Sequence, residues 1–80
     1  MIKLNETDAF LMETKLNIMR RNCRCPDGFD YALKADKHGV YITLQCVTYD
    51  GEVYSKDIRL ANLLKMNEKA LVRYTESYLC

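Results

Sequence analysis

The dipeptide Asp50-Gly51 constrains this chain more than any other feature, because it separates two segments rich in β-forming residues, 40–49 and 52–58. Asp-Gly between such segments is typical of a two-residue type I′ turn, which needs positive φ at both central positions. Glycine adopts positive φ freely and aspartate tolerates it. The sequence therefore predicts a β-hairpin in which Tyr49 pairs with Glu52.

An earlier segment, residues 29–35, alternates apolar and polar side chains and ends at the turn-forming residues 36–39. If Ala35 pairs with Val40, the apolar side chains of both strands collect on one face. This register makes the inner-face pairs Leu33–Ile42, Tyr31–Leu44 and Phe29–Cys46.

Extending that register through the Asp-Gly turn places Val53 and Ser55 on the inner face, opposite Thr48 and Cys46. The last strand then contributes little to the core and is predicted to be an edge strand. The outer face is predicted to carry three tyrosines and two lysines: Tyr41, Tyr49, Tyr54, Lys34 and Lys56.

Helical signals lie on both sides of the predicted sheet. Asn5 is the expected N-cap of a first helix whose apolar positions recur at spacings of three and four: Ala9, Met12, Leu16, Met19 and Cys23. Phe10, Leu11 and Ile18 lie off this stripe; either a loop or the C-terminal helices cover them, or they form a second apolar surface. After Ile58 the period becomes helical, and Asn67 is the expected N-cap of the second of two short helices. That helix is predicted to bury Ala70, Leu71, Tyr74 and Tyr78 or Leu79.

These elements predict one α+β domain over residues 1–80: an N-terminal helix, a three-stranded antiparallel meander and two C-terminal helices (α-β-β-β-α-α). Twelve Lys and Arg side chains against eleven Asp and Glu give a net charge of +1, so nucleic-acid binding would need a local basic patch. The first residues carry no apolar run of signal-peptide length, and no stretch is long and apolar enough to span a membrane. We therefore expect a cytoplasmic protein with reduced cysteines.

The sequence predicts no catalytic, metal or cofactor site, and hence no enzyme. His38 lies in a predicted turn without a neighbouring nucleophile, and the three glycines fall in separate turns rather than in a phosphate-binding loop. Cys23 and Cys25 are spaced more closely than paired zinc thiolates usually are. Cys23 and Cys46 are interpreted as small core residues.

Two groups of side chains are candidates for binding a protein partner. Tyrosines on an exposed sheet face suit protein contacts, and arginines at the end of the first helix suit anionic groups. Each group also has a structural interpretation. The tyrosines are ordinary strand formers, and the arginines are favourable charges at a helix C-terminus. The candidates are Tyr41, Tyr49, Tyr54, Arg20, Arg21 and Arg24.

Residues 58–78 resemble a helix-turn-helix in the spacing of Leu60, Ala61, Leu64, Met66, Leu71 and Tyr74, with Asn67 capping the second helix. Lys65 stands where that motif usually has glycine and would have to adopt the left-handed backbone conformation. The resemblance implies DNA contacts by Lys69 and Arg73, to which Lys56 and Lys34 could add from the sheet. Any two-helix hairpin, however, produces a similar spacing.

In size, charge balance and single-domain organisation, the chain resembles the small host-takeover and anti-defence proteins of bacteriophages, anti-CRISPR proteins among them. This resemblance implies a non-enzymatic protein that inhibits or regulates a larger host protein or nucleoprotein complex by occupying its surface. The alternative hypothesis is a nucleic-acid-binding module that uses the C-terminal helices or the tyrosine-bearing sheet face.

Overall fold

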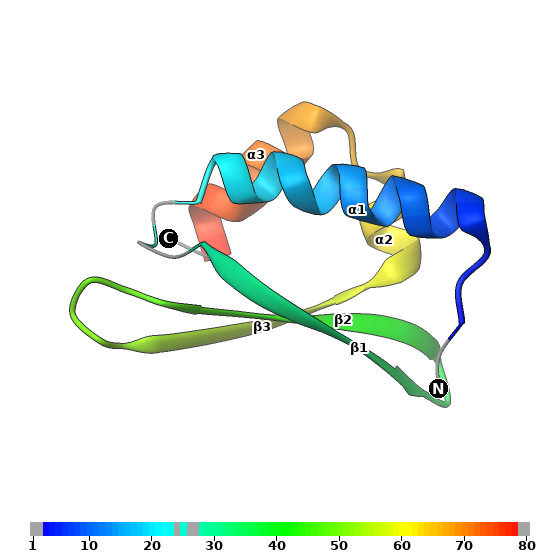
Figure 1. The fold of residues 1–80 in the computed structure, drawn as a ribbon, viewed down its shortest axis with the longest axis horizontal. Helices are drawn as coiled ribbons and strands as arrows, with labels where there is room; N and C mark the ends of the chain where they lie inside the picture. The colour runs from blue at the N-terminus through cyan, green and yellow to red at the C-terminus, as the bar shows by residue number, and fades with distance from the viewer. Residues whose placement is uncertain (1–2, 24, 26–27, 79–80) are drawn as a thin grey trace.

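The computed structural model describes residues 3–23, 25 and 28–78. Its elements follow the predicted α-β-β-β-α-α order, and the helices form one layer over one face of the antiparallel sheet (Figure 1). None of the helices in the described ranges is long and apolar enough to cross a membrane. The elements are α1 (Glu6–Arg21), β1 (Phe29–Asp36), β2 (Gly39–Val47), β3 (Val53–Arg59), α2 (Leu60–Lys65) and α3 (Glu68–Tyr78).

The predicted helix starts are confirmed by side-chain caps. The Asn5 side chain accepts a hydrogen bond from the Asp8 backbone N–H at 2.7 Å, and Asn67 accepts one from the Ala70 N–H at 2.8 Å. Each bond satisfies a backbone donor that the first turn of a helix would otherwise leave without an intrahelical partner. Along α1, Met12, Leu16 and Met19 of the predicted apolar stripe enter the core, whereas Phe10 remains 70% exposed.

The register of β1 against β2 is the predicted one, from Phe29 opposite Cys46 to Ala35 opposite Val40. It brings Ile42 and Leu44, both fully buried, under the helix layer. The fully buried side chains that fill the space between sheet and helices are Leu16, Met19, Ile42, Leu44, Leu63, Leu71 and Thr75.

The hairpin between β2 and β3 is closed differently from the prediction. The Thr48 N–H donates to the Glu52 carbonyl at 2.9 Å and the Gly51 N–H donates to the Thr48 carbonyl at 3.0 Å, so Tyr49, Asp50 and Gly51 form a three-residue loop. Among the described residues only glycines have positive φ, Gly51 at 84° included, so Asp50 cannot form a type I′ turn. The predicted pairing of Tyr49 with Glu52 is therefore wrong.

The extra loop residue shifts β3 by one position against the predicted register and so exchanges its two faces. Val53 pairs with Val47, Tyr54 with Cys46 and Ile58 with Ile42. The predictions that Tyr54 and Lys56 lie on the outer face, and Val53 and Ser55 on the inner face, are therefore wrong. The observed register is favoured because it buries Ile58 to 7% exposure beside the core. As predicted, β3 is an edge strand.

Helix α2 buries Leu60 and Leu63, and α3 buries Leu71 and Thr75. The Thr75 hydroxyl donates to the Leu71 carbonyl at 2.8 Å. The prediction that Tyr78 or Leu79 is buried fails for Tyr78, which is 53% exposed, and Leu79 lies outside the described residues. Between α2 and α3 the chain is extended at Met66 (φ −77°, ψ 133°), and the Lys15 ammonium donates to the Met66 carbonyl. Lys65 does not adopt positive φ.

Candidate partner-binding surface

The end of the β2–β3 hairpin projects beyond the helix layer (Figure 1). We call residues 47–53 the arm; it extends past the last β1–β2 pair, Phe29 with Cys46. Val47 and Val53 face each other across the arm on the outer side and are 49% and 57% exposed, and Tyr49 at its tip is 82% exposed. The arm therefore presents apolar side chains that the core does not use.

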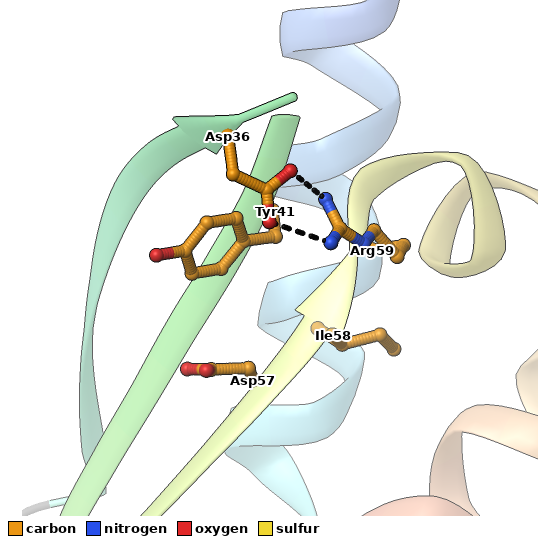
Figure 2. Close-up of a pocket in the computed structure, with 5 residues that line it drawn as sticks. All are labelled: Asp36, Tyr41, Asp57, Ile58 and Arg59. Atoms are coloured by element: carbon orange, nitrogen blue, oxygen red, sulfur yellow. Dashed lines mark hydrogen bonds and ion pairs between the residues drawn. The ribbon is translucent and has the colours of Figure 1, made fainter. Parts of the chain in front are cut away.

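At the opposite end of the outer face, a polar cluster joins β1, β2 and the end of β3 (Figure 2). The Arg59 guanidinium donates two hydrogen bonds to the Asp36 carboxylate, at 2.7 and 2.8 Å, and lies 5.3 Å from the centroid of the Tyr41 ring. Beside it, the Thr43 hydroxyl donates to Asp57 at 2.7 Å. The side chains of this cluster other than Thr43 border a hollow of roughly 200 Å³.

The electrostatics of this cluster are those of a matched ion pair. The Arg59 hydrogen bonds, together with one from the His38 backbone N–H, hold the pKa of Asp36 at about 2. The same contact with Asp36 raises the pKa of Arg59. The two side chains are 41% and 36% exposed, so water screens their attraction. The pair ties the end of β1 to the end of β3, across β2, and we interpret it as structural.

The three predicted partner-binding tyrosines do not share one face. Tyr41 lies half-buried on the outer face beside Arg59, and Tyr49 occupies the arm tip. Tyr54 lies on the inner face, 45% exposed, and its hydroxyl donates to Glu52 at 2.8 Å. This hydrogen bond raises the pKa of Tyr54.

The predicted arginines belong to the end of α1. The Arg20 guanidinium lies 5.0 Å from the centroid of the Phe29 ring and donates to the Asn17 side chain at 3.3 Å. Because Phe29 is the first residue of β1, Arg20 anchors the helix end near the base of the arm. Arg21 is exposed in the last turn, and Arg24 lies outside the described residues.

The residues predicted for nucleic-acid binding are distributed over different faces. Lys34 lies on the outer face opposite Tyr41, whereas Lys56 lies on the inner face with its ammonium 4.6 Å from the centroid of the Tyr78 ring. Lys69 and Arg73 are exposed on α3. The structure thus does not bring the four cations into one patch.

Sequence reasoning missed two features of the surface. Tyr74 and Tyr78 pair with ring centroids 4.8 Å apart, and their spacing of four residues on a predicted helix could have revealed this contact. The exposed pair Val47–Val53 was missed because it depends on the register of β3. The residue pattern of one strand alone does not identify this pair.

Comparison with known proteins assigns this chain neither to a family nor to a function. The chain matches no model of a known protein family, and the searches of curated proteins and of solved structures give no match. The function is therefore argued from the geometry of the described residues.

Proposed function

We propose that this chain is a small non-enzymatic binding protein that inhibits or regulates a larger protein or nucleoprotein complex by occupying its surface. The observation that carries this proposal is the arm, where Val47, Tyr49 and Val53 are exposed beyond the helix layer. The small phage anti-defence proteins that the chain resembles in size and charge balance act in this manner.

The physical basis is the burial of preorganised apolar groups. Val47 and Val53 are held side by side by the strand pairing, so a partner that covers them does not have to order them first. A tyrosine ring buries a large area, loses few rotatable bonds and offers a hydroxyl for hydrogen bonding, which makes Tyr49 the best candidate for a binding hot spot. The exposed Arg21, with Arg20 and Arg24, would affect mainly the association rate.

The test begins with capture of the partner from the source cell by the tagged chain, followed by affinity measurements with the purified partner. Tyr49→Ala should weaken binding by about 1 to 3 kcal/mol, roughly 5- to 150-fold, with little dependence on salt. Phe10→Ala is the matched control, because Phe10 is also an exposed aromatic residue but lies on α1. If Tyr49→Ala bound with wild-type affinity and Phe10→Ala bound more weakly, the interface would lie on the helix layer and not on the arm.

The alternative function, nucleic-acid binding, is favoured by one observation. Tyr78 is flanked by Lys56, and Arg73 lines a neighbouring hollow with Tyr74 and Tyr78, so cations and aromatic faces lie together on the α3 side. This combination suits single-stranded nucleic acid. Titration of duplex DNA, single-stranded DNA and RNA at two salt concentrations tests this alternative. Absence of binding at low salt eliminates it, and salt-sensitive binding that is lost on Lys69→Ala with Arg73→Ala supports it.

A further inference from the structure

The outer edge of β3 carries backbone groups that can pair with another strand. β3 is the end strand of the described sheet. Just before it, the Glu52 carbonyl accepts a hydrogen bond from the Thr48 N–H, so the backbone of Glu52 points toward the strand β2. Along an antiparallel strand, successive residues point their backbone N–H and C=O groups to opposite edges, so the backbone groups of Tyr54 and Lys56 also point toward β2. The residues that direct N–H and C=O to the open edge are then Val53, Ser55 and Asp57. Residues 53–59 contain no proline or glycine to interrupt pairing.

The side chains along this edge are self-complementary. Glu52 and Lys56 lie two positions before and two positions after Tyr54, on the same side of the strand. An antiparallel copy of β3 related by a two-fold axis at Tyr54 would place Tyr54 against Tyr54 of the second copy. Glu52 would then lie opposite Lys56 of the second copy, and this attraction occurs twice in the pair. Within the single chain Glu52 accepts a hydrogen bond from the Tyr54 hydroxyl and the Lys56 ammonium lies 4.6 Å from the centroid of the Tyr78 ring, so the ammonium would turn from Tyr78 toward Glu52 of the second copy.

The backbone permits this register, and the charges distinguish it from the other registers that the backbone permits. Edge pairing requires residues whose hydrogen-bonding groups face outward to lie opposite one another, and an axis at Tyr54 places Val53 opposite Ser55 of the second copy. The same requirement allows an axis at Ser55, which leaves Glu52 opposite an apolar side chain. It also allows an axis at Lys56, which sets two lysines against each other. Only the axis at Tyr54 matches both charges.

We infer that the open edge of β3 binds a second copy of this chain, forming a two-fold symmetric dimer with one continuous six-stranded sheet. The dimer covers Tyr54, which is 45% exposed in the single chain. Glu52 and Val53 belong both to the arm and to the paired edge, whereas the outer faces of Val47 and Val53 stay uncovered because the pairing uses the edge of the sheet and not its face. The inference does not depend on the proposed function.

Charge reversal tests the inference by sedimentation equilibrium over a range of concentrations. Glu52→Lys alone sets two lysines against each other at both symmetric contacts, and Lys56→Glu alone sets two glutamates together at both. Each variant should raise the dimer dissociation constant about tenfold or more. An equimolar mixture of the two variants restores both attractive pairs, as does the double variant Glu52→Lys with Lys56→Glu. These two samples should dimerise like the wild type.

Lys34→Glu provides the matched control, because it reverses an exposed charge on β1, the opposite edge of the sheet. It should dimerise like the wild type, and circular dichroism verifies that every variant is folded. A wild-type chain that remains monomeric up to about millimolar concentration would overturn the inference. Single variants that dimerise as well as the wild type, or a mixture that fails to recover, would equally overturn it.

Discussion

Replacement of Ile58 by alanine tests the register of β3, on which the faces of the arm and of the open edge depend. Ile58 is 7% exposed and pairs with Ile42, which is fully buried. Val53 lies on the same strand but on the outer face, where it is 57% exposed. The two positions therefore report on opposite faces of β3.

The expected cost follows from the carbon atoms removed from the core. Ile58→Ala deletes three carbons, worth about 0.8 kcal/mol each in transfer free energy, and the residual cavity adds to this sum. We expect a loss of about 3 kcal/mol in the free energy of unfolding. A domain of 80 residues has about 4 to 12 kcal/mol in total, so the melting temperature should fall by roughly 12 to 24 °C.

Urea unfolding followed by circular dichroism measures this loss, with a constant denaturant slope as the check on two-state behaviour. Val53→Ala is the matched control and should cost less than about 1 kcal/mol, because its side chain is mostly in water. A larger cost for Val53→Ala than for Ile58→Ala would show that Val53 faces the helices. That result would refute the three-residue loop and the face assignments derived from it.

Two further predictions concern local interactions. The folded-state pKa of Asp36, about 2, lies below its ordinary value of 3.8, so its pair with Arg59 stabilises the fold above the ordinary pKa and is lost as the pH falls through about 2. In urea unfolding from pH 7 to pH 2, the stability difference between wild type and Asp36→Asn should therefore be constant near neutrality and diminish in acid; a difference independent of pH would contradict the pair. Asn67→Ala should lower the free energy of unfolding by about 1 kcal/mol because it removes the cap on the Ala70 N–H. Asn62→Ala, at an exposed position within α2, is the control in the same unfolding assay, and equal losses for the two variants would contradict the cap.

Local patterns in the sequence were sufficient to predict the order of elements, the helix starts and the pairing of β1 with β2. The caps at Asn5 and Asn67 act within three residues, so neighbouring side chains alone reveal them. The β1–β2 register could be predicted because only one alignment places the apolar side chains of both strands on one face. Partner binding and the absence of enzymatic chemistry stay predictions.

The faces of β3, and the contacts that depend on them, follow only from the packing of the folded chain. Asp-Gly fits both a two-residue turn and a three-residue loop, so the turn residues leave the register open. The register is settled by burial of Ile58 beneath the helices, an interaction between segments distant in sequence. This burial moves Tyr54 to the inner face and Val53 to the outer face, because a shift of one residue exchanges the two sides of a strand.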